Sequence, residues 1–160
     1  MVHRKAAVLV AAAALAVAAA PALAKGPSST GSTPSISIAT INGSGGFAAS
    51  KPQPKFEDNV TWNTTLPSQT GSAYPMVDLS CYQDVNGDGV VNTTLTGPDI
   101  VYSWLGQPND TYSLGGYSSI WTQRGGGAAT CRANLVTISW KGGKESATIQ
   151  ASTGDFPVTA

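Results

Sequence analysis

The string of residues best suited to chemistry runs from Asp84 to Asn92, with the sequence Asp-Val-Asn-Gly-Asp-Gly-Val-Val-Asn. It places oxygen-bearing side chains at Asp84, Asn86 and Asp88, followed by a glycine, as in the first half of a calcium-binding loop. The pattern then fails, because Leu95 stands where such a loop needs a bidentate carboxylate. Asn-Gly and Asp-Gly are also favoured in β-turns. We therefore expect a hairpin loop here, with weak calcium binding as the alternative.

The N-terminal segment has the composition of a secretory signal peptide. Residues 1–5 form a short basic head, residues 6–20 an apolar run, and residues 21–24 a small-residue ending of the A-x-A type. The run is too short and too rich in alanine for a retained membrane span. We expect export and cleavage after this segment. Residues 25–35, rich in Ser, Gly and Pro, should then form a flexible leader, and residues 36–160 one folded domain.

The charge of the exported chain excludes several classes of partner. Cleavage removes Arg4 and Lys5 from nine basic residues, so seven remain against nine acidic ones, a net charge of −2. The remaining basic residues are scattered along the sequence and form no basic stripe. We therefore expect neither nucleic-acid binding nor attraction to an anionic membrane surface. After the N-terminal segment no apolar run of spanning length follows, so no membrane span is expected after cleavage.

The residues needed for common hydrolytic mechanisms are missing after export. A Ser-His-Asp or Cys-His arrangement needs an imidazole, and the only histidine, His3, lies in the signal peptide. Catalytic zinc is disfavoured for the same reason. Glycoside hydrolysis would need a carboxylate pair, and no spacing singles out two of the acids. We expect no catalytic residues and no enzyme. The acids considered are Glu57, Asp58, Asp78, Asp84, Asp88, Asp99 and Glu145.

The rest of the chain alternates apolar and polar residues, as half-buried β-strands do. Glycine-rich and proline-containing turns separate these stretches at the spacing typical of a β-sandwich. The Gly142-Gly143 pair suits a two-residue hairpin, because both central residues of such a turn need positive φ. We expect an all-β, antiparallel sandwich of about 7–9 strands. The predicted strands are residues 36–41, 59–63, 77–82, 90–95, 100–105, 118–123, 130–140, 146–152 and 155–158.

The two cysteines, Cys81 and Cys131, fall on the apolar faces of their predicted strands. Residues an even number apart have the same parity and lie on the same face of a strand. Cys81 shares the parity of Val77 and Leu79, and Cys131 shares that of Leu135. Two cysteines allow only one intramolecular bridge. In a secreted chain we expect a buried structural disulfide between them.

Aromatic side chains could hold a sugar or a protein partner if they were exposed. Tyr82 has the outward parity, opposite Cys81, and Trp140 flanks the Gly142-Gly143 hairpin, so these two are the ligand candidates, with packing in the core or against the hairpin as the favoured alternative. The other aromatics of the strands fit the core, because bulky rings usually fill the interior of a sandwich. Those expected to be buried are Trp62, Tyr102, Trp104 and Trp121.

Four stretches resemble a group of exported bacterial proteins with an immunoglobulin-like sandwich and no known function. They are Leu79–Gln83 (LSCYQ), Ser118–Thr122 (SSIWT), Ala129–Leu135 (ATCRANL) and the hairpin Lys141–Glu145 (KGGKE). The resemblance implies an immunoglobulin-like fold with one disulfide for the domain, and it says little about function.

Two features depart from antibody domains. Trp104, the first tryptophan after Cys81, lies much farther along the chain than the strand-C tryptophan would, and Ala129 stands where a tyrosine would precede the second cysteine. These departures leave open whether the bridge joins the inter-sheet pair of an antibody domain or other strands.

These observations favour a secreted, non-catalytic binding or structural module, monomeric, with an extracellular protein or glycan as its partner. The first alternative is a carbohydrate-binding module that uses exposed aromatics. The second is a weak calcium-binding module that uses Asp84, Asn86 and Asp88. A row of exposed aromatics on one sheet face would favour the first alternative.

Overall fold

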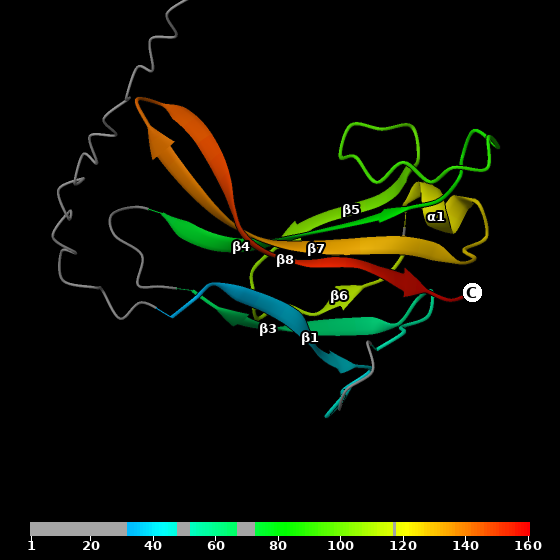
Figure 1. The fold of residues 1–160 in the computed structure, drawn as a ribbon, viewed down its shortest axis with the longest axis horizontal. Coiled ribbons are helices and arrows are strands. Elements are labelled where there is room, and N and C mark those ends of the chain that lie inside the picture. Colours follow the sequence, from blue (N-terminus) through cyan, green and yellow to red (C-terminus); the bar gives the residue numbers. More distant parts are fainter. Residues whose placement is uncertain (1–31, 48–51, 67–72, 117) are drawn as a thin grey trace, which may run out of the picture. The chain divides into compact units, whose positions relative to one another are not determined.

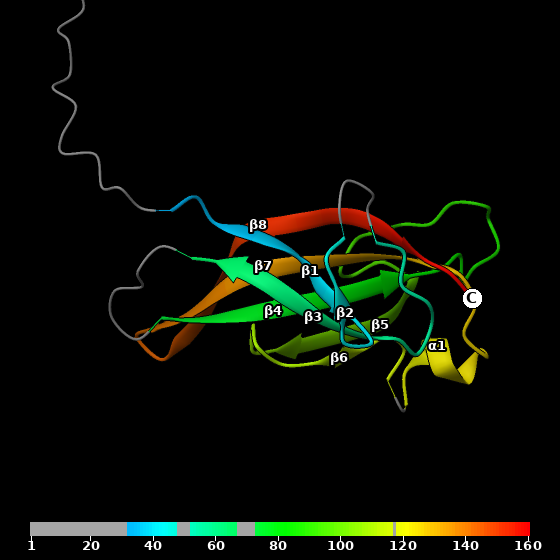
Figure 2. The same ribbon diagram turned by 90° about the horizontal axis from the view of Figure 1, so that it is seen from below.

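Two antiparallel β-sheets pack face to face in the computed structural model of this chain (Figures 1 and 2). The structure describes residues 32–47, 52–66, 73–116 and 118–160. The expected signal peptide and most of the expected leader lie outside these residues. The smaller sheet has the strand order β2-β1-β3-β6, and the larger sheet has the order β5-β4-β7-β8. This confirms the predicted all-β sandwich.

The described part of the chain contains eight strands and one short helix. They are β1 (Ser35–Ile41), β2 (Ser44–Gly45), β3 (Asn59–Thr65), β4 (Tyr74–Tyr82), β5 (Ile100–Gly106), β6 (Tyr112–Ser113), α1 (Ile120–Gln123), β7 (Ala129–Lys141) and β8 (Lys144–Val158). No helix of the described residues is long and apolar enough to cross a membrane.

The core lies between the sheets and follows the predicted alternation. On β3, Val60 and Trp62 are buried, whereas Asn59 and Asn63 are exposed. On β4, the inward side chains pair across to β7, Leu79 with Ala133 among them, and both of these are fully buried. Burial of such apolar side chains is the main force that holds the two sheets together.

Two groups of aromatic rings fill the core. Trp62 packs against Tyr112 and Phe156, with ring centroids 5.8 and 6.5 Å away. Trp121 packs against Phe56 and Tyr102, at 5.0 and 6.4 Å. The predicted burial of Trp62, Tyr102 and Trp121 is confirmed.

The prediction of a strand over residues 90–95 was wrong. This segment belongs to the long connection between β4 and β5 and pairs with no described strand. Its apolar residues mimic strand alternation, but Val90 and Leu95 are 64% and 50% exposed. Side-chain hydrogen bonds from nearby acids hold its backbone in a loop and compete with a sheet ladder, as such local bonds commonly do.

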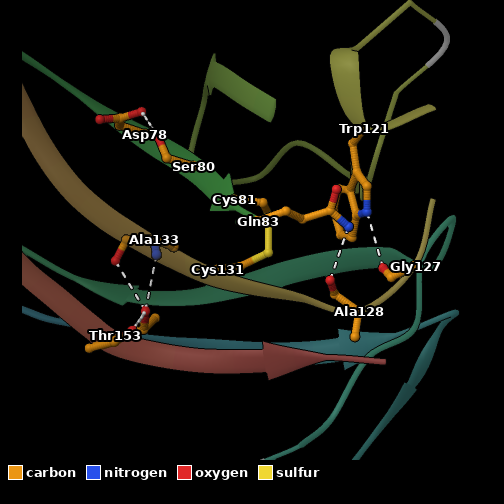
Figure 3. Close-up of a disulfide and its surroundings, with 11 residues drawn as sticks. Asp78, Ser80, Cys81, Gln83, Trp121, Gly127, Ala128, Cys131, Ala133 and Thr153 are labelled. Carbon is orange, nitrogen blue, oxygen red and sulfur yellow. Dashed lines mark hydrogen bonds between the residues drawn. A yellow bond between two sulfur atoms is a disulfide. The ribbon is translucent and has the colours of Figure 1, made fainter. Parts of the chain in front are cut away.

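The prediction of a strand over residues 118–123 was also wrong, because the segment forms helix α1. The Ser119 side chain accepts a hydrogen bond from the Thr122 amide at 3.1 Å, which caps the first turn. The helix directs Trp121 into the core, where it is buried. The indole nitrogen of Trp121 donates a hydrogen bond to the Gly127 carbonyl at 3.1 Å (Figure 3). A single turn of helix presents one large side chain to the core, which an alternation pattern cannot distinguish from a short strand.

The last two predicted strands form one strand, β8, interrupted by a bulge. The register with β7 shifts near Thr153 and Gly154, and Gly154 has φ +67°. The Thr153 hydroxyl accepts a hydrogen bond from the Ala133 amide at 3.0 Å, which replaces the missing ladder contact (Figure 3). At the other end of β8, Gly142 and Gly143 have φ +60° and +75°, which confirms the predicted two-residue turn.

Candidate binding surface

The predicted disulfide lies at the centre of the larger sheet and joins β4 to its neighbour β7. Cys81 and Cys131 are directly opposite in the register, their Cα atoms are 4.0 Å apart, and both are fully buried (Figure 3). The bridge therefore links adjacent strands of one sheet, whereas the antibody bridge links two sheets. It ties together the two strands whose outward side chains form the centre of the larger sheet's outer face.

One end of this outer face is polar and carries the row Ser80, Arg132 and Asp155 across β4, β7 and β8. Arg132 forms an ion pair with Asp155 at 2.7 Å, half exposed to solvent. A second guanidinium contact reaches the Thr93 hydroxyl in the β4–β5 connection at 3.4 Å. The connection thus folds back over this end of the sheet.

Tyr82, a predicted ligand residue, is only 1% exposed, so the prediction that it faces solvent was wrong. Its outward parity is correct, but it lies at the end of β4, where the connection to β5 begins and folds back towards Arg132. Burial is the largest effect on the phenol and raises its pKa above the ordinary value. An open cavity of about 600 Å³ borders Tyr82, with Asp84 and Arg124 among its lining residues.

The connection is held in shape by two aspartates. The Asp84 carboxylate accepts hydrogen bonds from the amides of Gly87 (2.7 Å), Asp88 (3.1 Å) and Gly89 (2.8 Å). Asp99, only 1% exposed, closes the far end of the loop. Its two oxygens accept from the amides of residues 85 (3.1 Å) and 92 (2.8 Å).

The calcium candidates Asp84, Asn86 and Asp88 lie together in one turn of this connection. Asn86 accepts a hydrogen bond from the Asp88 amide at 3.1 Å, and Asp88 accepts one from the Val90 amide at 2.8 Å. Within the described residues no group of three His, Cys, Asp or Glu side chains gathers around one point. Because calcium takes six to eight oxygen ligands, this turn could offer a cation only part of a coordination sphere.

The other end of the outer face is apolar. Tyr74 lies opposite Ile138 and Met76 opposite Val136, while Ile149 of β8 lies opposite Val136 from the other side. Val136 and Ile138, which lie on β7 between these side chains, are buried. Trp140, two residues beyond Ile138, continues the same face. We call this set the apolar patch: Tyr74, Met76, Leu105, Trp140 and Ile149.

Four members of the apolar patch remain substantially exposed: Tyr74 43%, Leu105 50%, Trp140 52% and Ile149 59%. Tyr74 and Trp140 occupy diagonal positions of neighbouring strands, where side chains lie within reach of each other. The ligand candidate Trp140 is thus exposed and has a second aromatic nearby on the same face. Tyr74, Leu105 and Ile149 were not identified from the sequence; the alternation of β4, extended to its first residue, was the signal for Tyr74.

A second exposed tryptophan lies at the edge of the larger sheet. Trp104 of β5 was expected in the core, but it is 53% exposed, so that prediction was wrong. Its parity points inward, yet β5 is an edge strand, and the facing strand β6 is only two residues long. Trp104 instead borders an apolar groove of about 590 Å³, together with Tyr102 and Ile120.

The acidic residues considered for catalysis are dispersed in structural roles. Asp58 accepts from the Lys55 amide at 2.6 Å, and Asp84 and Asp99 hold the β4–β5 connection. Asp78 lies on the outer face, where its carboxylate accepts a hydrogen bond from Ser80 at 3.4 Å. Burial raises its pKa, and the Ser80 bond offsets this in part. Glu145 lies opposite Trp140 beside the β7–β8 turn.

Comparison of this chain with protein-family models, with curated proteins and with solved structures finds no match in any of the three.

Proposed function

We propose that this chain is a secreted, non-catalytic binding module that holds an extracellular partner on the apolar patch. The observation that carries the proposal is the exposure of Trp140 and Tyr74 on one face of a rigid sheet. Soluble proteins seldom leave several large apolar side chains exposed together unless the surface is used. Tryptophan and tyrosine also dominate the binding energy of known interfaces.

The scaffold suits such a role. The disulfide crosslinks β4 and β7, the strands that carry Tyr74 and Trp140. Tyr74 and Trp140 are presented from a regular sheet rather than from a loop, so the backbone that carries them does not have to be ordered on binding, which favours affinity. The bridge is also compatible with the oxidising compartment to which the N-terminal signal would direct the chain. The kinship to exported immunoglobulin-like proteins is part of this proposal and rests on the sequence motifs.

A glycan is the second candidate ligand, because Tyr74 and Trp140 offer two neighbouring rings on one face. Aromatic rings present an apolar face and, in tyrosine and tryptophan, a polar edge. Glu145, opposite Trp140, adds a carboxylate acceptor for sugar hydroxyls. A weak calcium site at Asp84, Asn86 and Asp88 is a separate proposal, supported by the presence of the three oxygen-bearing side chains in one turn.

The test measures retention of partners by the immobilised chain on a glycan array and, separately, in a pull-down of extracellular proteins. Trp140→Ala and Tyr74→Ala should each weaken the retained interaction roughly thirtyfold, the effect of removing an interface hot spot. Phe47→Ala is the matched control, because Phe47 is 39% exposed but lies outside the apolar patch. Retention on neither probe would contradict the binding function, and retention insensitive to both patch variants would contradict the site.

A further inference from the structure

The four edges of the two sheets differ in how they are protected against pairing with another chain. β2 and β6 are only two residues long. β8 carries Lys144, Glu145, Asp155 and Pro157 and has bulges in its pairing with β7. Short strands, charges, prolines and bulges are the usual devices that block an edge. β2, β6 and β8 are therefore poorly suited to accept a further strand. The stretches that β2 and β6 leave unpaired, before Thr40 on β1 and after Val60 on β3, are shorter than β5.

β5 has almost none of these devices. Its seven residues contain no charge and no proline, and its one register irregularity lies at the Ile100 end. Only β4 pairs with it among the strands that the structure describes. Trp104 and Leu105, on its two faces, are both about half exposed. An edge of this kind attracts a partner strand, because its backbone groups and apolar side chains both remain available.

The sequence of β5 complements itself around Ser103. If a second copy ran antiparallel with its Ser103 opposite the first, Tyr102 would lie opposite Trp104 of the other copy. Ile100 would lie opposite Gly106, and Leu105 opposite Val101, which the register irregularity places in the core. The aromatic residues would thus pair on the inner face, and such cross-strand pairs stabilise antiparallel ladders. No like charges would meet.

The groove beside β5 provides the space that such a pairing needs. It is lined by residues 100–104 on one side and by Gly116 and residues 118–120 on the other. The groove has a volume of about 590 Å³, and its lining is predominantly apolar, with Tyr102 and Ile120 among the side chains. Trp104 of the second copy would enter this groove, and the two-fold symmetry would repeat the contact in the other copy.

We propose that this chain forms a two-fold symmetric dimer through antiparallel pairing of the β5 edges, centred on Ser103. The two larger sheets then join into one continuous eight-stranded sheet. The two-fold axis stands perpendicular to it, so both apolar patches face the same side. A multivalent partner would meet two patches at once and be held with avidity. The dimer is independent of the proposed ligand, and it replaces the expectation of a monomer.

The experiment measures the dissociation constant of the purified chain by sedimentation over a range of concentrations. Ser103 is exposed, so Ser103→Lys should fold normally, yet it would place two lysines directly opposite each other at the symmetry axis. We expect the dissociation constant to rise about fivefold or more. Mixing Ser103→Lys with Ser103→Glu should restore the dimer as a mixed pair. Thr148→Lys is the matched control, because it adds the same charge at an exposed position on β8.

The outcomes separate clearly. A wild-type chain that stays monomeric at its highest soluble concentration would overturn the proposal. A dimer that Ser103→Lys leaves intact, or that Trp140→Ala dissociates instead, would place the interface elsewhere and overturn it as well. Restoration by the mixed charges also shows that both variants are folded, so a misfolded variant cannot be mistaken for a dissociated one.

Discussion

Asp99 should contribute more to stability than any other acid in the β4–β5 connection. It is 1% exposed, and its two carboxylate oxygens accept hydrogen bonds from the amides of Val85 and Asn92. These two contacts join two parts of the connection that follows Tyr82. Asp99→Ala removes both acceptors and leaves two backbone donors without their partners.

The expected loss follows from those contacts. A hydrogen bond to a charged group is worth about 1.5–3 kcal/mol, so two of them set an upper range of about 3–6 kcal/mol. Asn92 is exposed, and water can replace part of its bond. We therefore expect Asp99→Ala to lower the free energy of unfolding by about 2–4 kcal/mol. Asp99→Asn keeps one acceptor oxygen and should lose about half as much.

Denaturant unfolding of the two variants gives these values directly, and hydrogen exchange at the Val85 and Asn92 amides locates the effect. Asp88→Ala is the control, because the Asp88 carboxylate is exposed and accepts from a single backbone amide, that of Val90. It should change stability by less than about 1 kcal/mol. If Asp99→Ala lost no more than this control, with exchange unchanged, the assignment of Asp99 as the loop's anchor would be refuted.

Three further predictions follow from the same structure. Replacing Cys81 and Cys131 by alanine should cost about 4 kcal/mol in denaturant unfolding, because the bridge closes a loop of 50 residues; a loss below about 1 kcal/mol would contradict this. Burial raises the pKa of Tyr102 to about 12 from its ordinary 10, so the folded state favours the neutral phenol. Its contribution to stability is therefore complete below pH 10 and is lost as the pH rises towards 12; tyrosinate absorbance that rises at pH 10 for all tyrosines would oppose this. Millimolar calcium should shift the melting temperature little, because the turn at Asp84, Asn86 and Asp88 offers only part of a coordination sphere. Saturation of a true site at a hundred times Kd would instead add about 2.7 kcal/mol, so a rise of many degrees, abolished in Asp84→Ala and Asp88→Ala, would establish a metal site.

The fold was largely predictable because alternation survives wherever a strand has one buried face. Val60 with Trp62, and Leu79 with Cys81, identified their strands and inward faces correctly. The cysteine pair was predictable on the same grounds, and so was the turn at residues 142–143, where only positive φ is compatible with the hairpin.

The errors arose where tertiary contacts override local pattern. Tyr82 has outward parity but is buried, which the alternation of its own strand does not reveal. Trp104 has inward parity but lies on an edge strand that a two-residue neighbour fails to cover. Trp121 is buried as expected, but it belongs to a helix and not to the predicted strand. Parity gives the direction of a side chain, whereas exposure also depends on what lies opposite, which a single sequence does not contain.

Footprinting by hydroxyl radicals tests the central claim, that the apolar patch binds the partner, most directly. The oxidation of Trp140, Tyr74 and Phe47 is measured in the free chain and in the presence of a glycan or protein retained by it. If the apolar patch binds the partner, Trp140 and Tyr74 become protected while Phe47 is oxidised as before. Protection of Phe47 with Trp140 and Tyr74 unchanged would contradict it.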